Sequence, residues 1–299
     1  MPLISTLTTG VSALRSFSKG LEVIGNNIAN VNTTGFKSSS VSFADTFSDT
    51  LRASAPSTGT TSDQSAVQVG TGVQVASIKA SFTQGALTST GNTTDLGISG
   101  NGFFIVKDGS GNQFATRDGE FRIDDKGYIV TSDGYKVQGL TGGSQATPVT
   151  DASTVGNLQI GQNIPTGLQL QSVSIDTGGN VLESYSDGTT AATNRVLLQN
   201  FSDPSALMKQ GSSLYTGLQA AGPISGSSGL VLGDVTNGSN DPGKNGLGLV
   251  QSGTLEQSNV DLAQQFSDLI TIQRSFQAGS RLITVSDTVL EDIVNLKQR

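Results

Sequence analysis

The chain has 299 residues and a formal net charge of −7, and only 34% of its residues are hydrophobic. It contains no Cys and no His, which excludes disulfides, thiol and imidazole catalysis and nearly all zinc sites. Lys and Arg form no cluster, and no apolar run approaches the roughly 18 residues of a membrane span, so we expect neither a nucleic-acid partner nor membrane insertion.

The N-terminal stretch carries apolar residues at a strict spacing of seven. These are Leu7, Leu14, Leu21 and Ile28. Such a repeat predicts a helix that associates with another helix along one face. Gly10, Gly20 and Gly25 each cost about 1 kcal/mol relative to Ala in a helix interior, so we expect packing to supply the order of this helix.

Four Asn residues occur within residues 26–32, which is unusual at the end of a helix. A C-terminal cap and turn closed by Gly35 would explain Asn32 and its neighbours, because Asn tolerates left-handed backbone. It does not explain Asn26, Asn27 and Asn30, which share one helical arc beside the apolar face. We interpret these three amides as hydrogen-bonding groups at a helix–helix contact.

The middle of the chain changes character twice. Residues 38–75 are rich in Ser and Thr and are predicted to form a partly extended connector, with a short helical tendency at residues 43–51. From residue 76 to residue 254, apolar residues alternate with polar ones, and Asp-Gly pairs separate the short runs. This pattern predicts a body of short strands and hairpins.

The C-terminal stretch repeats the heptad pattern of the first. Its row consists of Leu255, Leu262, Leu269, Phe276, Ile283 and Leu290. Ser258 and Asp261 predict a helix that starts near Asn259 and runs to Leu296, about 57 Å. The predicted fold class is therefore α+β, in which paired terminal heptad helices carry an inserted all-β body. Residues 1–37 and 255–299 would form the helical domain.

Several segments resemble the rod and hook proteins of the bacterial flagellum. The most specific is Asn-Asn-Ile-Ala-Asn-Val-Asn-Thr-Thr-Gly-Phe-Lys at residues 26–37. Residues 82–85, 90–104 and 116–128 are similar to the central pattern of that family, and residues 255–262 are similar to its hook branch. The resemblance implies a subunit whose paired termini form the inner core of a tube and whose β body forms the wall.

Patterns that could carry catalysis are better explained by turns. The order of glycines in residues 97–102 differs from the dinucleotide fingerprint, and an apolar strand follows instead of a helix. Asp124 and Asp125 lack the spacing of a calcium loop. We therefore expect no enzyme activity, no cofactor and no metal.

The resemblance favours the flagellar hook protein, a self-assembling, torque-transmitting subunit that is exported to the extracellular flagellum without an ordinary signal peptide. Its expected partners are further copies of itself, the neighbouring rod, hook-cap and hook–filament junction proteins, and the flagellar export apparatus. The alternatives are the distal rod protein, favoured by a body with little room for an extra outer β domain, and a secreted β-rich binding module. The residues expected at the assembly and helix interfaces are Leu7, Leu14, Leu21, Asn26, Asn27, Ile28, Asn30, Leu262, Leu269, Phe276, Ile283 and Leu290.

Overall fold

The chain folds as two units in the computed structural model, which describes residues 2–57, 62–143, 154–162, 164, 167–224 and 240–297. The helical unit comprises Met1–Ala29, Ser39–Ser81 and Val260–Arg299. The β unit comprises Asn30–Ser38 and Phe82–Asn259. Terminal helices and a large all-β body confirm the predicted α+β class.

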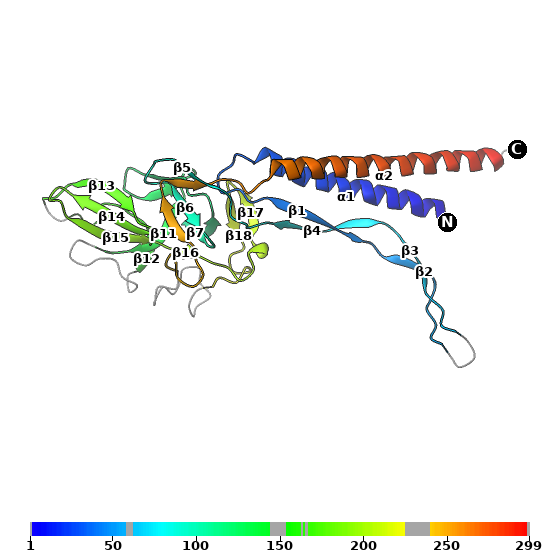
Figure 1. Cartoon of the computed structure of the whole chain (residues 1–299), viewed down its shortest axis with the longest axis horizontal. Helices are drawn as coiled ribbons and strands as arrows, with labels where there is room; N and C mark the ends of the chain where they lie inside the picture. The colour runs from blue at the N-terminus through cyan, green and yellow to red at the C-terminus, as the bar shows by residue number, and fades with distance from the viewer. Residues whose placement is uncertain are drawn as a thin grey trace. The chain divides into compact units, whose positions relative to one another are not determined.

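Two long antiparallel helices, α1 (Pro2–Ala29) and α2 (Leu262–Lys297), lie side by side in the helical unit (Figure 1). The 36 residues of α2 span about 54 Å. The helix starts three residues later than predicted, because the Asp261 carboxylate accepts bonds from the backbone N–H groups of Ala263 and Gln264 and so caps it. No helix in the described part of the chain is long and apolar enough to cross a membrane.

Four strands complete the helical unit. They are β1 (Ser39–Asp45), β2 (Ser48–Arg52), β3 (Val67–Gly70) and β4 (Val73–Ala80). β1 pairs antiparallel with β4, and β2 pairs antiparallel with β3. The helical tendency at residues 43–51 is therefore wrong: Phe43 pairs with Val75 across the ladder and packs edge-on against Phe17 of α1, with ring centroids 5.8 Å apart. β-branched and aromatic residues among Ser and Thr suit such a half-buried ladder.

The β unit is built from short antiparallel strands. Their bounds are β5 (Leu87–Ser89), β6 (Leu96–Ser99), β7 (Phe103–Lys107), β8 (Gln113–Thr116), β9 (Phe121–Ile123), β10 (Ile129–Thr131), β11 (Lys136–Thr141), β12 (Thr154–Asn157), β13 (Leu170–Ile175), β14 (Asn180–Tyr185), β15 (Thr190–Val196), β16 (Leu198–Gln199), β17 (Met208–Gly211), β18 (Leu214–Thr216), β19 (Leu249–Ser252) and β20 (Thr254–Glu256), with a 3-10 turn at Pro204–Ala206. The main sheet runs β13-β14-β15-β11-β7-β8-β18-β17, while β19 pairs with β6 and β20 with β5. Each predicted Asp-Gly turn that lies between paired strands closes a hairpin, as Asp187-Gly188 does between β14 and β15.

The central strand β7 has apolar cores on both of its faces. Phe104 and Val106 belong to one buried cluster, and Phe103 and Ile105 belong to the other. Successive side chains of a strand point to opposite faces, so a continuous apolar run of this kind marks a strand that is covered on both sides. These clusters give the β unit a core of its own, as expected for an independent domain.

Candidate functional site

The contact between α1 and α2 within the helical unit includes members of both predicted heptad rows, since Ile283 of α2 lies beside Gly10 and Leu14 of α1 lies beside Gly279. The partly buried members of these rows are Leu7, Leu14, Leu21, Ile28, Leu269, Phe276, Ile283 and Leu290. Leu262, at the start of α2, is 39% exposed. Leu14 and Ile283 therefore face the other helix of the same chain, and the part of the remaining row in helix contacts or in contacts between copies stays a prediction.

Glycines bring the two helices close together. A Cβ at Gly10 would lie 2.9 Å from Cγ1 of Ile283, and one at Gly20 would lie 2.9 Å from Cδ1 of Ile272. A Cβ at Gly279 of α2 would meet a leucine side chain of α1 at 3.4 Å. Sequence reasoning counted Gly10 and Gly20 only as a cost to the helix, whereas the structure shows that they make room for partner side chains.

The three asparagines predicted at a helix contact have different environments. Asn27 is buried, and its Nδ2 donates to the Ser39 carbonyl at 2.7 Å and to Oε1 of Gln265 in α2 at 2.9 Å. Its Oδ1 accepts a bond from the Ser39 N–H at 2.9 Å. Asn26 is exposed, and Asn30 belongs to the β unit, where its Oδ1 accepts a threonine hydroxyl. Asn27 is therefore the amide that joins α1, β1 and α2.

The α2 helix also exposes a set of large apolar side chains, most of them outside the heptad row. Its members are Leu262, Phe266, Ile270, Leu282, Val285, Val289, Ile293, Val294 and Leu296. Val285 is 61% exposed and Phe266 is 50% exposed. Leu282, Val285, Val289, Ile293 and Leu296 recur every three or four residues, so they form an exposed outer row along the C-terminal part of α2, of the kind that a partner covers.

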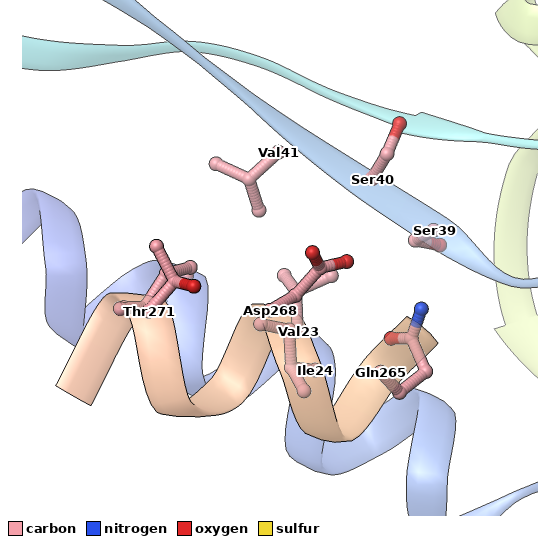
Figure 2. Close-up of a pocket in the computed structure, with 10 residues that line it drawn as sticks. Val23, Ile24, Ser39, Ser40, Val41, Gln265, Asp268 and Thr271 are labelled. Carbon is pink, nitrogen blue, oxygen red and sulfur yellow. The ribbon is translucent and has the colours of Figure 1, made fainter. Parts of the chain in front are cut away.

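A cavity of about 280 Å³ lies inside the helical unit between α1, β1 and α2. Val23, Ile24 and Val41 form apolar walls, and Gln265, Asp268 and Thr271 supply polar groups. Figure 2 shows the Asp268 carboxylate directed from α2 toward β1, below Val41. Apolar walls with a carboxylate suit a long side chain that ends in a cation.

A buried cluster of three charges lies in the β unit. Oε1 of Glu256 accepts a bond from Nζ of Lys37 at 2.7 Å, and its Oε2 accepts one from Nη1 of Arg117 at 3.1 Å. The side chains of Lys37 and Glu256 are fully buried, and that of Arg117 is 3% exposed. Burial lowers the pKa of Lys37 and of Arg117, because removal from water disfavours their charged forms, although Glu256 opposes this effect.

The same cluster holds backbone segments that are far apart in sequence. The Gly35 N–H donates to the Glu256 carbonyl at 2.8 Å, and the Gly85 N–H donates to Glu256 Oε1 at 2.8 Å. Gly35 has a φ of +64°, and a Cβ there would lie 2.5 Å from the Asp118 nitrogen. Glycine is therefore required at residue 35 both by backbone conformation and by space.

Lys37, Arg117 and Glu256 lie within the segments that resemble the family, but the sequence alone did not mark them as functional residues. A signal was present, since charged residues make up only 14% of the chain and these three lie inside its most distinctive segments. Their pairing cannot be read from spacing, because Lys37 and Glu256 are 219 residues apart.

The acidic residues considered for metal binding serve turns instead. Oδ1 of Asp124 accepts the N–H groups of Lys126 and Tyr128, which closes the β9–β10 hairpin. Within the described ranges, no group of three or more Asp or Glu side chains is placed to hold a metal ion.

Three family models match the chain in sequence order. "Flagella basal body rod protein" matches residues 7–37, "Flagellar hook protein FlgE/F/G D1 domain" matches residues 97–183, and "Flagellar basal body rod FlgEFG protein C-terminal" matches residues 251–296. Each matched region contributes one member of the buried charge cluster. The cluster therefore joins residues from all three matched regions.

Similar proteins agree with these models. The flagellar basal-body rod protein FlgG of Bacillus subtilis is 36% identical over 296 residues, which cover 99% of this chain and all of that protein. The chain belongs to the flagellar rod and hook protein family. The flagellar hook protein FlgE of Borreliella burgdorferi is 25% identical over 456 aligned positions, and that of Helicobacter mustelae is 48% identical over 139 residues, 46% of this chain and 31% of that protein.

Membership of the rod and hook family makes the chain a structural component of the flagellum, on the exterior side of the basal body. Subunits of this family assemble with themselves and with other axial components. The exposed row on α2 and the cavity beside Asp268 are accordingly the candidate surfaces for contacts between subunits.

Proposed function

We propose that the chain is the distal rod subunit of the flagellar basal body, which self-assembles into a stiff tube and transmits torque. The observation that supports this proposal is the alignment with the B. subtilis rod protein. It extends over 296 residues and covers 99% of this chain and all of the rod protein. The B. burgdorferi hook protein needs 456 aligned positions against the 299 residues here, so it carries extra sequence. This comparison favours the rod over the hook that the sequence motifs first indicated.

The strands of the helical unit support the same choice. The argument for a hook relied on a pliable connector at residues 38–75, because neighbouring hook subunits must slide as the hook bends. Residues 39–45 instead pair with residues 73–80, and residues 48–52 pair with residues 67–70. Two hydrogen-bonded ladders restrict backbone rotation far more than a floppy linker does, which suits a stiff rod.

The hook remains the second candidate because of one observation. The H. mustelae hook protein reaches 48% identity over 139 residues, above the identity to the rod protein. That match covers only 31% of the hook protein, so the two proteins are similar in one region and not over their whole lengths. In the hook reading, the hook-cap and hook–filament junction proteins would be neighbours; in the rod reading, the axial neighbours are rod and hook proteins.

Assembly in this proposal relies on the outer row of α2. The row would leave water when copies pack together, at about 25 cal/mol for each Å² of apolar surface removed. Subunits would reach the growing tip through the flagellar export apparatus, and a cysteine-free chain cannot become disulfide-linked on the way.

Deletion of the gene in its own bacterium tests the proposal. Purified basal bodies viewed by electron microscopy should end in a truncated rod without a hook, and the full-length gene should restore both. A complete rod that lacks only its hook would overturn the rod assignment in favour of the hook protein. Normal basal bodies would refute both readings.

A further inference from the structure

Two surfaces of the helical unit carry opposite charges. The cavity between α1, β1 and α2 holds one acidic group, the Asp268 carboxylate. Its Oδ1 accepts a bond from the Gln264 amide at 2.8 Å, and no Lys or Arg of the described residues forms an ion pair with it. The residues three and four positions from Asp268 on α2 are two Gln, one Thr and one Ile, so α2 itself places no cation beside this carboxylate.

The second surface is a groove on the outer side of α2, away from α1. Arg274 and Arg281 line it together with Leu282 and Val285, which are 54% and 61% exposed. Neither arginine has an acidic residue three or four positions away, and neither forms an ion pair within the described parts of the chain. The groove thus presents unpaired cations between exposed apolar side chains.

Two carboxylates and two arginines have the same spacing along the chain. Asp261, which caps α2, and Asp268 are seven residues apart, and so are Arg274 and Arg281. Seven residues of helix span about 10.5 Å, which brings each pair onto one side. Two parallel copies of α2 displaced by 13 residues, about 20 Å, therefore place Arg281 opposite Asp268 and Arg274 opposite Asp261.

We propose that the Asp268 cavity receives Arg281 from the outer groove of a second copy of this chain. The aliphatic part of the arginine lies against Val23, Ile24 and Val41, and its guanidinium meets the Asp268 carboxylate. Figure 2 shows that this carboxylate points into the space between α2 and β1, where an entering side chain would reach it. Arg274 then pairs with Asp261 at the N-terminus of the same α2.

The contact joins two different surfaces, so it does not saturate in a dimer. Each copy that offers its groove still has an empty cavity, and each copy that offers its cavity still has a free groove. Such a heterologous contact extends into an open filament when its rotation does not close. The inference rests on the proposed function for its partner, a second copy, and adds the register of that contact.

Crosslinking tests the register directly, because the natural chain has no Cys. The full-length variant Asp268→Cys/Arg281→Cys, concentrated and treated with a short bismaleimide, should give a ladder of oligomers on a denaturing gel. Each single-cysteine variant should stop at dimers. The variant Asp268→Cys/Arg274→Cys is the matched control and should give at least about tenfold less ladder, since residue 274 lies one seven-residue repeat, about 10.5 Å along the helix, from residue 281. An absent ladder, or a stronger one from the control, overturns the proposal.

Charge exchange provides an independent test. Asp268→Arg and Arg281→Asp should each raise the critical concentration for assembly by about tenfold or more, because like charges then face each other. The double variant should recover, and so should an equal mixture of the two single variants. Asp287→Arg, an exposed change on the same helix that lines neither surface, should assemble like the natural chain. Failure of the double variant to recover would refute the pairing.

These results are separable from the rod assignment. A ladder from the crosslinked variant together with normal basal bodies in the deletion strain would refute the rod assignment and leave the contact in place. A truncated rod in that strain without any ladder would refute the contact and leave the assignment in place.

Discussion

Nζ of Lys37 lies 2.7 Å from Oε1 of Glu256, and both side chains are completely removed from solvent. The pair closes a loop of 219 residues, so it connects segments that only the folded β unit brings together. A buried charge that loses its partner is strongly destabilising, even where the pair itself adds little net stability.

Replacement of either partner should therefore unfold the β unit at a lower temperature. We expect Lys37→Met or Glu256→Gln to reduce the free energy of unfolding by about 3–5 kcal/mol, measured by urea or thermal melts of the full-length protein. The double variant should lose less than the sum of the two single changes, because it leaves fewer uncompensated charges.

Lys244 supplies the control for this experiment. It also pairs with a carboxylate, at 2.9 Å from Asp241, but its side chain is 52% exposed. Lys244→Met should change the free energy of unfolding by only about 0–1 kcal/mol. Equal losses at Lys37 and Lys244 would contradict the assignment of a special role to the buried cluster.

Asp118 predicts a dependence of stability on pH. Burial raises the pKa of its carboxyl above the usual 3.8. The charged form is therefore penalised in the folded state at neutral pH, and this cost disappears as pH falls through the folded-state pKa toward 3.8. Asp118→Asn keeps an oxygen that can accept the Glu120 N–H, a bond of 3.1 Å.

We expect Asp118→Asn to raise the melting temperature at pH 7, and we expect this gain to shrink steadily as pH falls to about 3.8. Thermal melts at a series of pH values measure it. Asp125→Asn, an exposed change in the same unit, should stay within about 0.5 kcal/mol of the natural chain at pH 7. A gain for Asp118→Asn that is larger in acid than at neutral pH would reverse the predicted sign.

Periodicity was sufficient to predict the architecture but not the contacts. Leu269, Phe276 and Ile283 indicated a helix that packs along one face, and they lie on the side of α2 that meets α1. Spacing cannot tell whether that partner belongs to the same chain or to another copy, because both satisfy the same apolar row. A second apolar row that includes Phe266, Ile270, Ile293 and Val294 could also be predicted from the sequence, whereas the exposed Leu282, Val285 and Val289 were not predicted.

The sequence predicted the strand at residues 73–78, but the strands of residues 39–70 and the charge cluster escaped prediction for a different reason. Phe43 and Val75 pair across about 30 residues of Ser- and Thr-rich sequence, and Lys37 meets Glu256 from the other end of the chain. Such long-range pairings are decided by tertiary context, which overrides weak local propensity. The only sign of the charge cluster in the sequence was that Gly35, Lys37, Arg117 and Glu256 lie within the segments that resemble the family.

The glycines between α1 and α2 should not tolerate larger residues. Gly10→Ala would place a Cβ 2.9 Å from Ile283, so we expect the helix pair to separate slightly and assembly to require a higher protein concentration. Gly25 offers the control, because a Cβ there meets nothing within 4 Å. Gly25→Ala should strengthen α1 by up to about 1 kcal/mol and lower the critical concentration. Sedimentation of assembled protein measures both, and equal effects of the two changes would show that contact distance is irrelevant.

Substitutions in the two apolar rows of α2 should disrupt two different contacts, the pairing of α1 with α2 and the contact between copies. Phe276→Asp places a charge in the seam with α1, where its burial without a partner costs several kcal/mol, so the helix pair should not form. Val285→Asp changes a side chain that is 61% exposed, so the pair should form normally while contacts between copies are lost. Protease protection of residues 1–30 reports the helix pair, and electron microscopy reports the filaments. We expect Phe276→Asp to abolish both, Val285→Asp to abolish only filaments, and Ser280→Asp, an exposed change on the same helix, to abolish neither. Filaments of normal yield from Val285→Asp would show that the outer row faces water and that copies meet elsewhere.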